Sequence, residues 1–369
     1  MQSLPATDRA TLQKLISKGF SPPPHAIAAC RIVRDDEQNE ADLSRIAIFL
    51  PTMLDRLEEQ ESAEYLASLA AQLEAAARNQ KVALSFYIAL QHAGSRQDIA
   101  IAALEKAVGI IEAPLAAVSV SMPIVALVLD ATGKVNSINE MTRLALTKDV
   151  EAVVLIDDDV SFSPNCFDRL IAAYLDRPSP CAIGARKLGR PLNTRASSIL
   201  HKLKSFTQPA ENYPHACCMI VSIEVISPRI PPIYSSDDGY ICFRLLDVKN
   251  AKNPLHKLTL IDDAWCYHMV GGRNTVEIKS RIRRILLHHH LFLSHADPET
   301  SLYYSSQILF YGLWPWVPFD WSRGWRAGAI KCAIKYLYAI WFTKIAIELI
   351  MRGRSNRPMN QIKWGNVPE

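Results

Sequence analysis

The chain has 369 residues, of which 49% are hydrophobic and 21% are charged, and its formal net charge at pH 7 is +4. This length and apolar content are sufficient for one large domain or two ordinary domains with a sizeable core. The small positive charge argues against a general nucleic-acid-binding protein and leaves a local anionic ligand or a membrane surface as partners. Eight cysteines occur without a C-x-x-C pair or a zinc-ligand spacing, which is typical of buried thiols in a reduced, cytoplasmic protein.

The first part of the chain predicts an N-terminal extension and then alternating strands and helices. A short helix over residues 1–20 ends at Pro22-Pro23-Pro24, and we place the extension at residues 1–42. Strands are expected at Arg45–Leu50, which Pro51 ends, and at Val82–Leu90, Ala116–Ser121, Ile124–Leu129 and Val153–Ile156, with helices at Leu54–Arg78, Asp98–Val108 and Asn136–Leu146. This alternation predicts an α/β fold with a mainly parallel sheet and helices on both faces.

The second part of the main domain, which we place at residues 43–290, is less regular. Its pattern indicates helices at Pro164–Tyr174, Tyr240–Leu246 and Val276–His295, strands at Ala182–Gly184, Ala216–Val221, Leu258–Ile261 and Ala264–Tyr267, and a loop over 186–212. The first 20 residues lack the apolar segment of a signal peptide, and no run of about eighteen uncharged apolar residues predicts a membrane-spanning helix. We therefore expect a protein of the cytoplasm.

Three consecutive carboxylates, Asp157, Asp158 and Asp159, directly follow the apolar run Val153–Ile156. Such a run is typical of a strand buried on both faces, and ligands of open α/β sheets collect at the carboxyl ends of the strands. Because side chains alternate along an extended chain, Asp157 and Asp159 are expected to point to the same side. A hard divalent cation would relieve their repulsion, so the stretch predicts a metal site; a polar strand end with a helix cap is the alternative.

The order of several motifs over residues 43–290 resembles that of the family 2 glycosyltransferases, which have the GT-A nucleotide-sugar fold. The opening strand resembles the family's strand in its closing Pro51-Thr52, and the turn after the second strand resembles the family's in Gly94-Ser95. The other resembling motifs are Gly133-Lys134 with Asn139, the D-x-D metal motif at Asp157-Asp158-Asp159, the Thr-Glu-Asp motif at Ser236-Asp237-Asp238, the strand ending in Tyr267-His268, and the basic motif Arg281-x-x-Arg284.

The resemblance implies an inverting, metal-dependent transfer of a sugar from a nucleoside-diphosphate donor to a hydroxyl acceptor. Asp159 would bind the divalent cation, Mg²⁺ or Mn²⁺, while Asp157 would bind the donor ribose or the metal through water. His268 would complete the metal shell, with burial in the core as its alternative. The donor would be bound by Pro51, Thr52, Lys134, Asn139, Asp157, Asp158, Arg281 and Arg284. The alternatives are a surface position for Lys134 and a solvated basic helix face for Arg281 and Arg284.

The acceptor side of this expected site rests on Asp237 and Asp238. The resemblance implies that Asp238 is the general base at the acceptor hydroxyl, a role that contributes about 10²–10⁴-fold to a rate. Asp237 would tune this base or bind the acceptor. The alternative is that the pair caps the helix that follows from Tyr240, and both roles are compatible with each other.

Two departures from the family pattern limit the functional prediction. Gln91, His92 and Ala93 stand where the family usually has acidic residues that read the nucleotide base, and Ile285 follows Arg284 where polysaccharide-making members have Trp. We expect a hexosyl- or N-acetylhexosaminyltransferase in polysaccharide, glycolipid or glycoconjugate synthesis. The alternatives are a degenerate transferase retained as a binding or scaffold subunit, and a nucleotidyltransferase, which would carry a Gly-rich loop after the first strand.

The C-terminal region, residues 291–369, predicts a strongly apolar helix over Trp325–Met351. Tryptophans precede this helix and arginines follow it, as in segments that lie at a membrane interface or against a partner. Lys331 and Lys335 fall on a different side of the helix from Lys344 and Glu348, so no single clean apolar face is expected. Packing on the catalytic domain is the alternative to a membrane surface.

Overall fold

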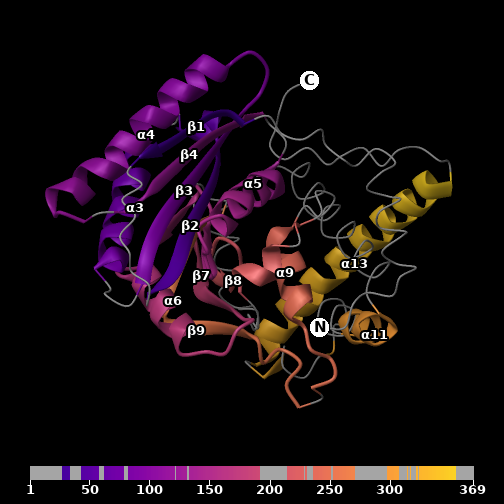
Figure 1. Ribbon diagram of the computed structural model, residues 1–369. Coiled ribbons are helices and arrows are strands. Elements are labelled where there is room, and N and C mark those ends of the chain that lie inside the picture. Colours follow the sequence, from indigo (N-terminus) through magenta and orange to yellow (C-terminus); the bar gives the residue numbers. More distant parts are fainter. Residues whose placement is uncertain are drawn as a thin grey trace.

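The computed structural model describes residues 27–33, 43–57, 62–78, 82–120, 122–130, 133–191, 214–227, 229–230, 236–250, 252–270, 297–306, 314, 316, 321–322 and 324–354. Within these ranges the chain forms a nine-stranded sheet in the order β1-β4-β3-β2-β5-β8-β7-β9-β6, with helices packed on it (Figure 1). The strands are β1 (Ile27–Val33), β2 (Ser44–Met53), β3 (Val82–His92), β4 (Ile124–Asp130), β5 (Ala152–Ile156), β6 (Val160–Phe162), β7 (Ala182–Pro191), β8 (Cys218–Ser222) and β9 (Leu258–Val270). The predicted α/β fold is therefore confirmed.

The helices divide between the two faces of the sheet. They are α2 (Leu54–Leu57), α3 (Ser62–Ala77), α4 (Gln97–Ala117), α5 (Lys134–Leu146), α6 (Cys166–Leu175), α8 (Ile223–Ile226), α9 (Asp237–Leu245), α11 (Pro298–Ser306) and α13 (Trp325–Arg354). One buried cluster joins the sheet to α3, α4 and α6, and a second joins it to α5, α8 and α9. Figure 1 shows α3 and α4 on one side of the sheet and α5 and α9 on the other.

The sheet is parallel only in the half that carries β4, β3, β2 and β5. Beyond β5, strand β8 is antiparallel to both β5 and β7, while β9 is parallel to β7 and antiparallel to β6. The expectation of a mainly parallel sheet is wrong for this second half, because local sequence periodicity does not record strand direction. At the other edge, β1 pairs antiparallel with β4, so part of the predicted N-terminal extension adds a strand to the sheet.

Several predicted boundaries differ from the structure where long-range pairing decides them. Strand β2 continues past Pro51 to Met53, and the stretch expected as a strand over 116–121 instead begins with the last turn of α4. Strand β7 runs on to Pro191 through part of the predicted loop, because it pairs with β9 over that length. The two strands expected over 258–267 are one continuous β9. The helices predicted over 1–20 and 276–295 lie outside the described residues.

Strand β5 shows why the run before the three carboxylates is continuously apolar. Val154 and Ile156 face the cluster beneath α3 and α6, whereas Val153 and Leu155 face the cluster beneath α5 and α9. All of these side chains are at most 1% exposed. Burying each of them stabilises the fold by about 1.5–3 kcal/mol, so the strand and the residue that follows it are held firmly in place.

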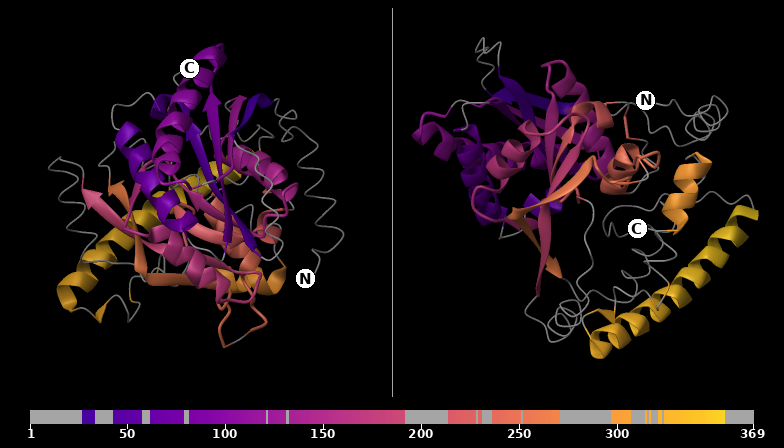
Figure 2. Two further views of the ribbon diagram at one scale, coloured as in Figure 1. Left: turned by 60° about the vertical axis from the view of Figure 1, so that its left-hand side comes forward. Right: turned by 90° about the horizontal axis from the view of Figure 1, so that it is seen from below.

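The helix expected over Trp325–Met351 is present as α13, and the described part of the C-terminal region also contains α11. The right-hand view of Figure 2 shows α13 as a long rod apart from the sheet and from the helices that cover it. Asp297 caps α11 through its Oδ1 atom, which accepts a hydrogen bond of 2.9 Å from the Thr300 N–H, and Pro298 occupies the first helical position. Within the part of the chain that the structure describes, no helix combines the length and apolar character needed to cross a membrane.

Candidate active site

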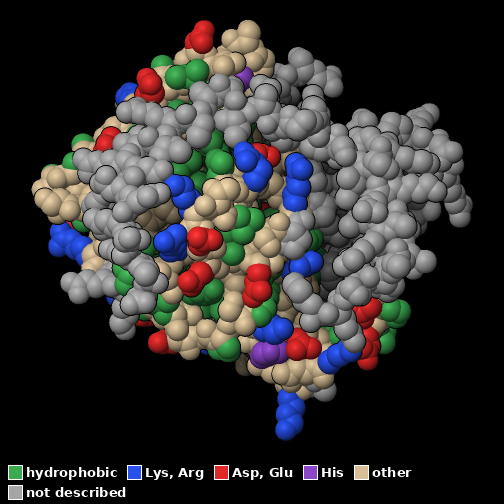
Figure 3. Space-filling model, in the orientation of Figure 1, with side chains coloured by type: hydrophobic (Ala, Val, Ile, Leu, Met, Phe, Trp, Pro, Cys, Tyr) green, Lys and Arg blue, Asp and Glu red, His purple; other side chains and the backbone are tan. Residues whose placement is uncertain are grey.

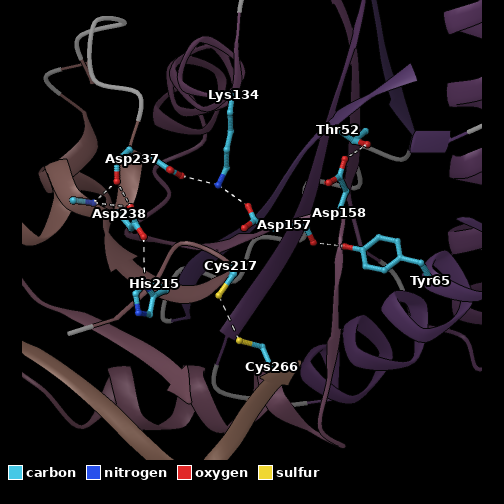
Figure 4. Close-up of polar contacts among 12 residues, drawn as sticks. Thr52, Tyr65, Lys134, Asp157, Asp158, His215, Cys217, Asp237, Asp238 and Cys266 are labelled. Carbon is cyan, nitrogen blue, oxygen red and sulfur yellow. Dashed lines mark hydrogen bonds and ion pairs between the residues drawn. The ribbon is translucent and has the colours of Figure 1, made fainter. Parts of the chain in front are cut away.

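Strand register brings four distant segments together at the carboxyl end of β5. Asp157–Asp159 forms the turn between β5 and β6. Because Ile156 pairs with Cys218, the residues before β8 lie beside this turn, and the Asp157 N–H donates to the Cys217 carbonyl over 3.3 Å. Val160 pairs with His268, so the end of β9 also lies next to Asp159. The start of α9 faces the turn from the far side, as Figure 4 shows.

Lys134 joins the two acidic stretches. Its Nζ atom lies 2.5 Å from Oδ1 of Asp157 and 2.9 Å from Oδ2 of Asp237 (Figure 4). Only 9% of the Lys134 side chain and 8% of the Asp237 side chain are exposed. Burial alone would lower the pKa of Lys134, but the two carboxylates raise it well above its ordinary value. The ammonium is therefore charged and links the strand end to the helix start.

The turn before α5 fixes the position of Lys134. Gly133 has φ +98°, a conformation that side-chain-bearing residues rarely adopt, so the turn requires glycine. The side-chain amide of Gln91 holds both backbone groups of Gly133: its Nε2 donates to the carbonyl over 2.9 Å, and its Oε1 accepts from the N–H over 3.0 Å. Gln91, which departs from the acidic family pattern, thus has a structural role here.

The turn Asp157–Asp159 presents its carboxylates to different partners. Asp158 turns toward β2, where the Thr52 hydroxyl donates to its Oδ2 atom over 2.7 Å, and burial raises its pKa to about 6. Tyr65 from α3 donates to the Asp157 carbonyl over 2.9 Å, which holds the turn from beneath. The Asp159 side chain is exposed; partial desolvation and the nearby charge of Asp157 raise its pKa. Asp159 is thus the carboxylate of the turn that opens most to solvent.

Asp238 receives hydrogen bonds on both oxygens. Its Oδ1 accepts from the Gly239 N–H over 2.8 Å and from the Ser236 hydroxyl, and its Oδ2 lies 3.3 Å from Nδ1 of His215. Ser236 is also the N-cap of α9, accepting from the Gly239 N–H over 3.3 Å. Burial raises the pKa of Asp238, but the hydrogen bonds from His215 and Ser236 outweigh it, so the net pKa lies well below the ordinary range. Asp237 and Asp238 therefore form the first turn of α9 and also face the site.

Not every predicted residue has a described side-chain contact with these acidic residues. The Asn139 amide donates to the carbonyl of Ile230 over 2.8 Å and accepts from its N–H over 2.9 Å, so this buried side chain ties α5 to the segment after α8. Pro51 lies within β2, one residue before Thr52. His268 Nδ1 lies 3.0 Å from the Leu188 carbonyl. Arg281 and Arg284 lie outside the described residues.

The chemistry of the donor set fits a hard divalent cation. Within the described ranges, no group of three or more His, Cys, Asp or Glu side chains is placed to hold a metal ion. Mg²⁺, however, is commonly bound by one or two protein carboxylates together with substrate phosphates and water. Asp159 could provide one such carboxylate and Asp157, whose Oδ1 atom lies 2.5 Å from the Lys134 ammonium, a second, and His268 pairs with Val160, the residue after Asp159.

The fold and the position of the acidic cluster define the class: the chain has the fold of the GT-A glycosyltransferases. Among solved structures it is similar to the mannosyltransferase PcManGT from Pyrobaculum calidifontis, determined with GDP-Man and Mn²⁺, with a TM-score of 0.51. The two share 15% sequence identity, and the match covers 95% of this chain and 97% of that one. A likeness at this identity shows the fold.

Two further solved structures match the chain with lower TM-scores. S. aureus TarS has 13% identity and a TM-score of 0.40, covering 82% of this chain and 54% of TarS. Glucosyl-3-phosphoglycerate synthase from Mycobacterium tuberculosis, in complex with Mg²⁺ and UDP, has 13% identity and a TM-score of 0.35, covering 69% of this chain and 81% of that chain. No protein-family model and no curated protein matches the sequence.

Sequence reasoning found the two acidic stretches and missed three residues that organise them. His215, Gln91 and Tyr65 come from segments without a recognisable motif. For Gln91 the sequence offered one indication, because this polar residue directly follows the predicted strand Val82–Leu90. In the structure its side chain contacts the Gly133 turn at that edge of the sheet. For His215 the sequence carries no such signal, because only the antiparallel pairing of β8 with β5 brings it to the site.

Proposed function

We propose that the protein is a family 2, metal-dependent, inverting glycosyltransferase that moves a sugar from a nucleoside-diphosphate donor to a hydroxyl acceptor. The observation that carries the proposal is the bridge of Lys134 between Asp157 at the end of β5 and Asp237 at the start of α9. On a GT-A fold, this bridge supports one site that contains both a metal-binding stretch and an acceptor-side acid pair. The mannosyltransferase structure with GDP-Man and Mn²⁺ supports the same assignment.

On the donor side, Asp159 and Asp157 would hold a divalent cation, with His268 completing the set. Such a cation supplies neutralisation of the charge that develops on the departing diphosphate. Lys134 adds a second positive charge at the same place, and Thr52, through Asp158, keeps the turn in position. Arg281 and Arg284 stay predicted diphosphate contacts.

On the acceptor side, the acid pair would remove the hydroxyl proton as the acceptor attacks the sugar. Asp237 is committed to Lys134, and Asp238 faces His215. The start of α9 would therefore supply the general base of the reaction. The ion pair of Asp237 with Lys134 would hold this helix next to the metal-binding turn.

The structure favours the transferase over its alternatives. A degenerate scaffold was suggested by Gln91 in place of an acidic residue, but Gln91 positions the turn that carries Lys134. A nucleotidyltransferase would need a Gly-rich phosphate loop after the first strand of the parallel core, whereas β2 is followed directly by α2 at Leu54.

Thermal unfolding of the intact chain with GDP-mannose or UDP-glucose, each with and without Mn²⁺, tests the proposal. A ligand at 100 times its Kd stabilises the folded state by about 2.7 kcal/mol, which raises the Tm of a protein of this size by about 3–4 °C. We expect this rise with Mn²⁺ and a much smaller one with EDTA. An unchanged Tm across a full panel of nucleotide-sugars with Mn²⁺ contradicts the proposal.

We further propose that the protein acts at the cytoplasmic face of a membrane through α13. Tyr336, Ile340, Ile347 and Met351 are each more than half exposed, and their spacing places them on one stripe of the helix. Seven cysteines within the described residues are free thiols, which supports a reducing compartment. Figure 3 shows acidic and basic side chains intermixed on the face it presents, in keeping with the small net charge.

Flotation with vesicles that contain phosphatidylserine tests the role of α13. The double change Ile340→Glu and Ile347→Glu is expected to abolish co-flotation. The change Ile99→Glu, at an exposed apolar position of α4, is the matched control and should leave it intact. If the wild-type chain does not float with the vesicles, the membrane assignment is wrong.

A further inference from the structure

Lys134 already places a positive charge on one of the carboxylates that the proposed function assigns to the metal. Its Nζ atom lies 2.5 Å from Oδ1 of Asp157, and only 9% of its side chain is exposed. The Gly133 turn, which Gln91 holds through both backbone groups, fixes where α5 begins and so where this side chain starts. Figure 4 shows the ammonium between Asp157 and Asp237, in contact with each. The first carboxylate of the turn therefore has a cation supplied by the protein itself.

The charge of Lys134 also acts on Asp159, the most open carboxylate of the turn. Burial and the charge of Asp157 raise the pKa of Asp159, and the positive charge of Lys134 opposes this rise, together with those of Arg56 and Lys187. Like charges repel strongly where water is partly excluded. Without any other ligand, Lys134 therefore opposes the approach of a divalent cation to the turn.

A nucleoside diphosphate changes this balance. An ammonium group carries three N–H donors, and among the described residues Asp157 and Asp237 each accept one of those of Lys134. The remaining donor can bind a phosphate oxygen, and the phosphates also supply oxygen ligands to a hard divalent cation. The negative charge of the diphosphate thus attracts both cations and offsets the repulsion between them.

We infer that Lys134 couples the metal site to the donor: without a nucleoside diphosphate it weakens the binding of divalent cations at the Asp157–Asp159 turn, and with one it helps to hold them there. This inference rests on the proposed function and adds to it that metal and donor bind together. Because such coupling is reciprocal, the cation raises the affinity for the donor by the same factor as the donor raises the affinity for the cation. The turn therefore does not retain a divalent cation between two rounds of transfer.

Binding of Mn²⁺ alone to the full chain, followed by electron paramagnetic resonance of the free ion, tests the inference. The double change Lys134→Met and Asp237→Asn removes one charge of each sign, so the net charge of the site is unchanged while Asp157 loses its cation. We expect this variant to bind Mn²⁺ about 10-fold more tightly than the wild type. A further Asp159→Asn change should abolish the gain. Asp237→Asn alone, which keeps Lys134 on Asp157, is the matched control and should show no gain.

Calorimetric titration with GDP and UDP, each with Mn²⁺ or with EDTA, tests the part of the inference that concerns the donor. Mn²⁺ should raise the nucleotide affinity of the wild type by a factor about 10-fold larger than that of the double variant. Chelation of Mn²⁺ by free nucleotide is the same for both proteins and cancels in this comparison. Lys134→Gln with Asp237→Asn, which keeps polar side chains at both positions, serves for both measurements if the methionine variant does not fold.

Two results would overturn the inference and leave the proposed function intact. One is a wild-type chain that binds Mn²⁺ alone as tightly as the folded double variant. The other is an equal effect of Mn²⁺ on nucleotide binding by the two proteins. A failure of the proposed function would show differently, as a wild-type chain that binds no nucleoside diphosphate in the presence of Mn²⁺.

Discussion

The site is built from two acidic stretches that differ in how the protein treats their charges. The first, Asp157–Asp159, lies at the end of a buried strand and leaves Asp159 open to solvent. The second, Asp237-Asp238, lies at the start of α9, where each carboxylate already has partners: Lys134 for Asp237, and Ser236, Gly239 and His215 for Asp238. In the first stretch Asp157 and Asp158 also have partners, Lys134 and Thr52, so Asp159 is the carboxylate that is open to a cation, whereas both carboxylates of the second stretch are already paired.

Although both stretches consist of aspartates, their different surroundings give them different functions. Carboxylates with open coordination bind metal ions, and carboxylates saturated by hydrogen bonds orient their donors. Lys134 forms an ion pair with each stretch and so, among the described residues, links the two directly. The predictions below disturb this contact first and then each stretch by itself.

Replacing Lys134 by Met should have the largest effect. The change leaves the buried Asp237 carboxylate without its cation, and loss of one partner of a buried ion pair costs about 3 kcal/mol or more. Urea denaturation would show the lower free energy of unfolding. Adding Asp237→Asn should recover part of the stability, and Lys148→Met, on an exposed turn, should change it by less than about 0.5 kcal/mol. If Lys134→Met has the same free energy of unfolding as the wild type, the bridge contributes nothing to stability.

The change Asp159→Asn should affect binding and not folding. The side chain is exposed, so we expect an unchanged Tm without ligand but a loss of about 100-fold in the Mn²⁺-dependent affinity for nucleoside diphosphate. Isothermal titration calorimetry measures this affinity. Asp262→Asn, which removes an exposed partner of Arg186, is the control that should bind normally. Equal binding by both variants would remove Asp159 from the metal site.

Thr52→Val should destabilise the protein in a pH-dependent way. Burial raises the pKa of Asp158 to about 6 in the folded state, so its ionisation costs stability as the pH rises from about 4 to about 6. The Thr52 hydroxyl offsets part of that cost because it donates to the ionised carboxylate. Loss of the hydroxyl should therefore cost about 1–2 kcal/mol at pH 8 and less at pH 5. Urea denaturation in EDTA at both pH values checks this, and an equal loss at both would show that Asp158 stays charged.

Ser236→Ala should have the smallest effect. The change removes the N-cap of α9, which typically costs about 1 kcal/mol, and it also removes one donor to Asp238. Hydrogen exchange of the first turn of α9 should rise, while exchange in β5 should stay as in the wild type. Equal protection of α9 in the variant would show that Asp238 and its contacts suffice to hold the helix start.

Much of the fold was accessible from the sequence because local patterns carry it. The apolar run Val153–Ile156 predicted a strand buried on both faces, and β5 is such a strand. The stretch from Tyr240 predicted a helix, and α9 begins three residues earlier because Ser236 supplies its cap. Where pairing partners lie far away, as for the extension of β7 along β9 and the edge strand β1, local patterns predicted a loop and an extension instead.

The candidate site divides in the same way. The sequence by itself determined which carboxylates follow the buried strand and which open the later helix, because side-chain period and capping chemistry act over a few residues. Only the tertiary structure decided that Lys134 spans the two, that Gln91 holds the Gly133 turn and that His215 faces Asp238. These contacts depend on strand order and register, which arise from burial summed over the whole sheet and leave no mark at any one position of the chain.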